Sequence, residues 1–147
     1  MSKNHDPLVR WVIGLSLFGV LLSLYSLAHK TGFTAGALCN LSDTLSCDIV
    51  NRGPYSSLLG VPVAGIGVVG YLFLVMAGWM KLKHPTDQGL SRFLLAASAV
   101  GLAFALYLTS LEAFVLHAWC VVCLASQFTI AALAALSYVL FRYDNHP

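Results

Sequence analysis

The sequence predicts an all-α integral membrane protein in which four transmembrane helices form a bundle and an outer, cysteine-containing loop caps it. The first observation is the composition, because 59% of the 147 residues are hydrophobic and only 10% are charged. Soluble domains contain about 45–50% apolar and about 25% charged residues. The second observation is a set of four apolar stretches of sufficient length to cross a bilayer. The formal net charge is only +2, and no row of basic residues with interleaved aromatic residues is present, so nucleic-acid binding is not indicated.

The four stretches are each about 20 residues long, which at about 1.5 Å per residue covers a hydrocarbon core of roughly 30 Å. They must be helical, because lipid offers no partner for free backbone N–H and C=O groups. Little chain remains outside them, so residues 1–147 are expected to form one domain. The predicted spans are 8–28, 61–80, 93–114 and 119–141.

The first span has a second interpretation, a cleaved signal peptide, because Lys3 and Arg10 lie at its N-terminal end. Its apolar run exceeds the 7–15 residues usual in such peptides. Trp11 and Tyr25, near its two ends, fit the aromatic belt of a transmembrane helix. We therefore expect it to be retained.

Basic residues are distributed unequally between the two sides of an alternating bundle. Only Lys30 and Arg52 fall in the long first connection. By the positive-inside rule both termini are expected in the cytoplasm, with the connection 29–60 and the turn 116–119 facing outward. The residues on the expected inner side are Lys3, Arg10, Lys81, Lys83, Arg92 and Arg142.

All four cysteines fall at the expected outer face. Cys39 and Cys47 lie in the long connection, and Cys120 and Cys123 form a C-V-V-C at the start of the last span. Disulfides persist on the outer side of the membrane and not in the cytosol. Four cysteines allow three pairings, and the spacing alone leaves all three open.

The C-V-V-C pair has the features of a redox centre. Cys120 lies near a helix N-terminus, where free N–H groups and the helix dipole favour the thiolate that attacks disulfides. Cys123 lies one turn deeper, toward lipid, and is better placed to meet a membrane-dissolved acceptor. Cys39 and Cys47 flank a polar segment and can reach water and a soluble partner. Together the pairs form a potential relay.

Two other interpretations compete with the relay. The first is a structural membrane protein with two stabilising disulfides, as in tetraspan adhesion proteins, although a C-x-x-C bridge closes almost no loop. The second is a metal site, because four thiolates suit zinc or copper(I) and His117 is near. The seven residues between Cys39 and Cys47 are unusual for a zinc pair, so no metal is expected.

Two segments of the sequence carry recognisable motifs. One runs from Cys39 and Cys47 through Pro54-Tyr-Ser-Ser, Leu-Leu-Gly-Val-Pro and the glycine-rich second span. The other is Tyr107-Leu-Thr-Ser-Leu-Glu-Ala-Phe-Val-Leu-His-Ala-Trp-Cys-Val-Val-Cys. Both resemble the vitamin K epoxide reductase family in its bacterial form. The similarity extends over nearly the whole chain. The DsbB family also has four helices and two cysteine pairs, but it places its C-x-x-C in the first outer loop.

The resemblance implies an enzyme, a quinone reductase and thiol oxidase of a bacterial inner membrane that supports disulfide formation. Cys120 and Cys123 would face the quinone, ubiquinone, menaquinone or vitamin K in type, with Cys123 closer to its ring. Cys39 and Cys47 would shuttle electrons, Cys47 through a mixed disulfide with Cys120 and Cys39 with the external partner. That partner would be a separate periplasmic thioredoxin-fold oxidant of the DsbA type, because no such domain is fused here. Vitamin K epoxide reduction is the alternative activity.

Three positions depart from the family pattern. The serine usual after the second loop cysteine is Gly53 here, so Ser56 or Ser57 is expected in its supporting role. Gln127 stands where eukaryotic members have a tyrosine, and its amide can still donate to a quinone carbonyl. Val63 occupies the position of a helix-two asparagine, which favours plain quinone reduction over epoxide reduction.

The quinone pocket is expected among the outer halves of the four helices. Besides Gln127 and Val63, we expect Gly67, Tyr71 and Trp119 to contribute to it. Glu112 is a supporting residue, because a carboxylate in the hydrocarbon is costly and usually functional. It is expected to reach the headgroups, to take up a proton during thiol exchange or to support the outer loop. By contrast, Asp144 and the turn 85–89 have the pattern of solvated ends.

Overall fold

The computed structural model describes residues 5–32, 54 and 57–146, and in this part of the chain four long helices form a bundle, which confirms the predicted fold class. Cys39, Cys47, Gly53 and Ser56 lie outside the described residues. The elements are α1 (Asp6–Lys30), β1 (Ser57–Leu58), β2 (Val61–Pro62), α3 (Val63–Lys83), α4 (Gln88–Leu111), the π-helical turn η3 (Glu112–Leu116) and α5 (Val121–Asn145).

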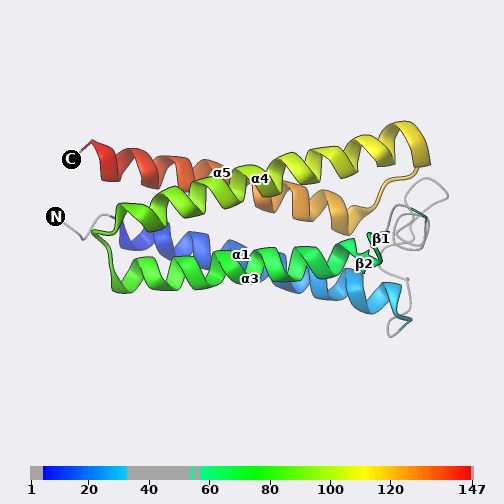
Figure 1. The fold of residues 1–147 in the computed structure, drawn as a ribbon, viewed down its shortest axis with the longest axis horizontal. Coiled ribbons are helices and arrows are strands. Elements are labelled where there is room, and N and C mark those ends of the chain that lie inside the picture. The colour runs from blue at the N-terminus through cyan, green and yellow to red at the C-terminus, as the bar shows by residue number, and fades with distance from the viewer. Residues whose placement is uncertain (1–4, 33–53, 55–56, 147) are drawn as a thin grey trace.

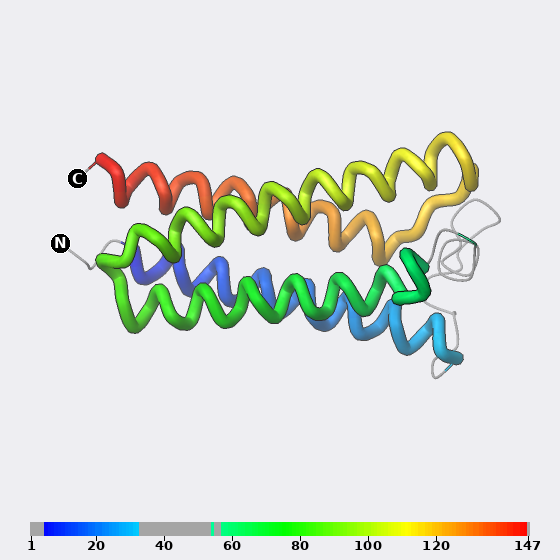
Figure 2. Tube along the Cα trace, in the orientation of Figure 1, coloured from blue at the N-terminus to red at the C-terminus, as the bar shows by residue number. Residues whose placement is uncertain are grey.

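The helices alternate in direction, and both termini lie at the same end of the bundle (Figure 1). The α3–α4 connection lies at this end, which we call the termini end. The β1–β2 hairpin and the α4–α5 connection lie at the opposite end, which we call the cysteine end (Figure 2). α1 packs extensively on α3 and also on α5, α4 packs on α5, and α3 and α4 contact each other less.

The helix boundaries follow from local chemistry. α4 begins at Gln88, five residues before the predicted span, because the Asp87 side chain caps it by accepting a hydrogen bond from Gly89 N at 2.8 Å. α3 begins at Val63, later than predicted, because Val61 and Pro62 pair with β1 in an antiparallel hairpin. Gly60 forms the turn of this hairpin with φ +83°, a left-handed conformation that glycine adopts without strain.

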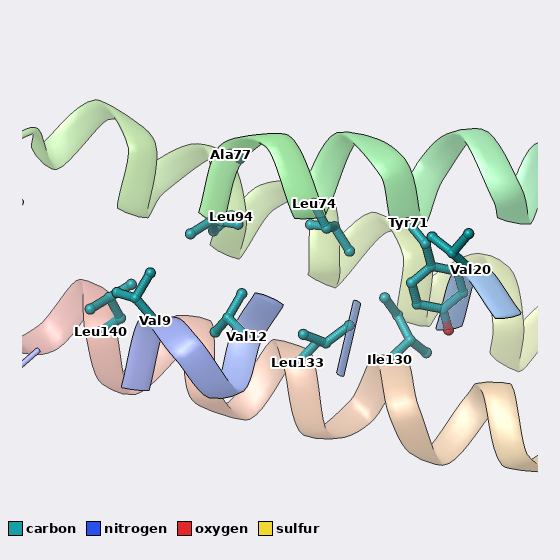
Figure 3. Close-up of a cluster of buried hydrophobic side chains, with 10 residues drawn as sticks. All are labelled: Val9, Val12, Val20, Tyr71, Leu74, Ala77, Leu94, Ile130, Leu133 and Leu140. Carbon is teal, nitrogen blue, oxygen red and sulfur yellow. The ribbon is translucent and has the colours of Figure 1, made fainter. Parts of the chain in front are cut away.

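The bundle interior is built from apolar side chains of all four helices. Figure 3 shows ten buried side chains that lie between the helices, with Leu94, Leu133 and Leu140 fully buried. Their helices come close because small residues lie at the contacts. A Cβ at Gly19 would collide with the Tyr71 ring, and a Cβ at Gly78 would lie 2.8 Å from Ile13 Cγ1. These glycines therefore set the spacing between α1 and α3.

A buried ion pair joins the helices at the termini end. Lys81 Nζ lies 2.6 Å from Asp144 Oδ2, and the two side chains are 0% and 7% exposed. Lys81 also donates to Asp87 O at 2.9 Å, and the Ser91 hydroxyl donates to the same carboxylate oxygen. The expectation that Asp144 is a solvated end was wrong, because helix packing brings it against residues more than fifty positions away.

Candidate functional site

Cys120 and Cys123 lie together at the cysteine end, where the chain turns from α4 into α5. The turn is made by η3 and by His117, whose φ of 51° is left-handed. Cys120 is the N-cap of α5, and its sulfur accepts a hydrogen bond from Cys123 N at 3.4 Å. Cys123 is a free thiol in this structure. The position of Cys120 matches the helix start expected from the sequence.

The Cys120 sulfur is buried although it lies at the end of the bundle. The residue is 0% exposed and packs against Tyr25 of α1, Val122 and Cys123. Hydrogen bonding by the Cys123 thiol, and to a smaller extent by backbone N–H groups at the start of α5, lowers the pKa of Cys120 below its ordinary value. A thiol whose pKa is lowered is more often the nucleophilic thiolate.

Glu112 connects this pair of sulfurs to the preceding helix. Its carboxylate accepts a hydrogen bond from Cys120 N at 3.3 Å and also interacts with the Cys123 thiol through its side chain. Glu112 is 3% exposed, so it does not extend away from the protein toward the headgroups. It is the first residue of η3, and π-helical turns occur often at functional sites.

A cavity of about 710 Å³ lies between the helices, and Cys123 is part of its wall. Residues of all four helices line it, mostly through apolar side chains. Glu112 and Cys123 are part of the wall at the cysteine end, whereas Phe93 and Ala97 line it in the half of α4 nearer the termini end. The cavity therefore extends further along α4 than the outer halves of the helices.

The predicted site residues divide into those that line the cavity and those that do not. Trp119, which is half-buried, and Cys120 are not among the described residues of the wall. Ser57 lies in β1 and accepts a hydrogen bond from Lys30 Nζ at 2.6 Å, which places it beside a wall residue. The predicted residues in the wall are Val63, Gly67, Tyr71, Glu112, Cys123 and Gln127.

Two polar contacts inside the cavity involve predicted residues and partners that sequence reasoning missed. The Thr109 hydroxyl donates to Gln127 Oε1 across the α4–α5 contact. The Tyr71 hydroxyl donates to Ser126 O at 2.9 Å and lies at 2.9 Å from Ser126 Oγ. No local signal pairs these residues, because they lie on different helices.

The cavity wall includes side chains on the outer surface of the bundle. Phe73 of α3 is 56% exposed and Val100 of α4 is 70% exposed, and both line the cavity. α3 and α4 are also the neighbouring helices with the less extensive contact. The cavity thus borders the lipid-facing surface between α3 and α4.

Among residues 5–32, 54 and 57–146, no cluster of three or more His, Cys, Asp or Glu side chains could hold a metal ion. The four helices are long and apolar enough to make this a multi-pass membrane protein. A family model described as the vitamin K epoxide reductase family matches residues 10–138, and no individual curated protein matches the sequence. The chain therefore belongs to the vitamin K epoxide reductase family, a family of membrane oxidoreductases that act on quinones and vitamin K.

Proposed function

We propose that this protein is a thiol–quinone oxidoreductase that reoxidises a periplasmic, DsbA-like thioredoxin-fold protein. One observation carries the proposal: Cys123 is in the wall of a large apolar cavity, while its partner Cys120 caps the same helix at the end of the bundle. A dithiol in this position can receive electrons from the water side and deliver them into a membrane-embedded cavity. We infer that the cysteine end faces the periplasm.

The chemistry of the cavity fits a quinone as the acceptor. A quinone has a flat apolar ring, an apolar tail and two carbonyl oxygens that only accept hydrogen bonds. The wall is mostly apolar, and the Gln127 amide is a donor near Cys123. The Gln127 carbonyl oxygen is engaged by Thr109, which leaves the N–H groups of Gln127 for a substrate carbonyl. Thr109 is thus a positioning residue for this amide.

The electron route that we propose has two disulfide exchanges. The reduced partner protein attacks a Cys39–Cys47 disulfide at Cys39, so that its own disulfide forms and Cys39 and Cys47 become thiols. Cys47 then attacks Cys120 of a Cys120–Cys123 disulfide, which breaks that bond and releases Cys123 as a thiol. Cys39 next attacks Cys47 in the mixed disulfide, so that the Cys39–Cys47 disulfide forms again and Cys120 is released as a thiol. Reoxidation of the Cys120–Cys123 pair gives two electrons to the quinone, which takes up two protons and leaves as the quinol.

Plain quinone reduction is favoured over reduction of vitamin K epoxide. Val63 lines the cavity, and its side chain carries no hydrogen-bonding group for an epoxide oxygen. Epoxide reduction remains the alternative within the same family, and it is tested by offering the epoxide to the purified protein.

The decisive experiment is anaerobic quinone reduction by the purified protein, with a dithiol or a reduced thioredoxin-fold protein as donor. The expected result is turnover that is abolished by Cys123→Ala, because the sulfur in the cavity wall is then missing. Ser110→Ala is the matched control, since Ser110 is exposed and does not line the cavity. Full turnover by Cys123→Ala would contradict the electron route.

The same assay separates this function from a purely structural role of the cysteines. If the cysteines only stabilise the fold, each substitution lowers the resistance to unfolding and the parent protein reduces no quinone. The redox function instead predicts loss of turnover in Cys120→Ala and Cys123→Ala with little change in unfolding, because a bridge between residues three apart closes almost no loop.

A further inference from the structure

We propose that Glu112 is a catalytic proton carrier that takes the proton of the Cys123 thiol and passes it to a quinone oxygen. The inference rests on the proposed thiol–quinone activity and extends it, because it assigns the proton route that must accompany the electrons. It follows from one carboxylate that interacts with both cysteines and also lines the cavity.

The contacts, position and burial of Glu112 support this role. Its carboxylate accepts a hydrogen bond from Cys120 N, which holds it at the start of α5. It interacts with the Cys123 thiol, and it lines the cavity that Cys123 also lines. A carboxylate that is 3% exposed within a transmembrane helix is costly to retain. The hydrogen bond to one backbone N–H satisfies only part of its accepting capacity.

The other ionisable groups in the described wall are less suited to this task. Tyr71, on α3, has its hydroxyl engaged with Ser126. Lys30, at the end of α1, donates to Ser57 and is not itself a proton acceptor when charged. Glu112 is therefore the carboxylate that touches both the reacting thiol and the space where the substrate ring would lie.

The proposed step balances in atoms and charge. It starts from Cys120 as thiolate and Cys123 as thiol. Glu112 accepts the Cys123 proton while the S–S bond forms, and two electrons pass to the quinone. Glu112 then gives this proton to one quinone oxygen, and the other oxygen takes a proton from the outer aqueous phase. The products are the disulfide and a neutral quinol, and Glu112 returns to its carboxylate form.

The test uses Glu112→Gln, which preserves shape and hydrogen bonding but not basicity. The amide oxygen can still accept the hydrogen bond from Cys120 N, so the α4–α5 turn is retained. The rate of quinone reduction is expected to fall about 100-fold or more, the range lost when a positioned acid–base group is removed. Glu112→Asp is expected to recover part of this loss, and Ser110→Ala, two residues earlier in α4, is the control.

A second measurement does not depend on quinone. In quinone-stripped, reduced protein, the rate at which N-ethylmaleimide alkylates Cys123 is followed by peptide mass spectrometry. If Glu112 accepts the thiol proton, Glu112→Gln slows alkylation about tenfold or more. If the carboxylate acts only as a negative charge or a structural contact, alkylation becomes faster or does not change, and the proposal is refuted.

The two measurements separate the thiol–quinone activity from the proton-carrier role of Glu112. A parent protein that reduces no quinone would overturn the proposed function, while slower alkylation of Cys123 in Glu112→Gln would still assign proton transfer to Glu112. Normal turnover and normal alkylation in Glu112→Gln would leave the thiol–quinone activity in place and overturn the proton carrier alone.

Discussion

The ion pair between Lys81 and Asp144 offers the clearest test of how the bundle is held together. Lys81 is fully buried, and its ammonium group has two oxygen contacts, Asp144 Oδ2 at 2.6 Å and Asp87 O at 2.9 Å. The Ser91 hydroxyl donates to the same Asp144 oxygen. The Asp144→Leu variant leaves this ammonium group buried without its counter-charge. Removal of one partner from a buried pair costs about 3–5 kcal/mol.

The loss of stability expected for Asp144→Leu comes from the unpaired charge of Lys81 and not from the loss of the pair itself. A double variant, Lys81→Met with Asp144→Leu, removes both charges and is expected to recover most of the loss. Replacement of a buried pair by apolar residues is often neutral or stabilising, by about 1–4 kcal/mol. The comparison of single and double variants therefore isolates the cost of the uncompensated charge.

The assay is reversible unfolding in mixed micelles, measured as the free energy of unfolding of the purified protein. The matched control is Lys83→Met, because the Lys83 ammonium lies at 5.9 Å over the Trp79 ring and the residue is exposed. Such an exposed contact contributes about 0.5–1 kcal/mol. A loss below about 1 kcal/mol for Asp144→Leu, or a double variant no more stable than the single, would refute the reasoning.

Three further outcomes are expected. Gly19→Ala should lower the free energy of unfolding by about 1–3 kcal/mol, because the new Cβ collides with the Tyr71 ring on α3. Gly14→Ala, which has open space around it, should be neutral or stabilising, and equal free energies of unfolding for the two variants would contradict this. Thr109→Val should raise the KM for quinone about tenfold, because the hydrogen bond to Gln127 is lost, while Thr109→Ser should keep the KM of the parent protein. An unchanged KM in Thr109→Val would contradict the positioning role of Thr109. Gly70→Phe should raise the KM for long-tailed quinones more than the KM for tail-free analogues, because Gly70 lines the cavity. The exposed Val69 gives the control variant Val69→Phe, and an equal rise in KM for both kinds of quinone in Gly70→Phe would contradict a bound tail.

The fold class could be predicted because it depends on quantities that are local in the chain. The length and apolarity of a span, and the backbone's need for hydrogen bonds in lipid, determine a transmembrane helix without reference to its neighbours. The helix ends were less predictable. Asp87 extends α4 by capping it, and the β1–β2 pairing delays the start of α3 to Val63. Both depend on contacts outside the apolar run.

The sequence alone determined the four helices and the position of the C-x-x-C pair at the start of the last helix. Only the tertiary structure decided which side chains meet across helices. Thr109 meets Gln127, Tyr71 meets Ser126, and Lys81 meets Asp144 at sequence separations that carry no periodic signal. The physical reason is that lipid provides no hydrophobic drive toward particular helix pairs, so close packing at small residues and interhelical hydrogen bonds determine the arrangement.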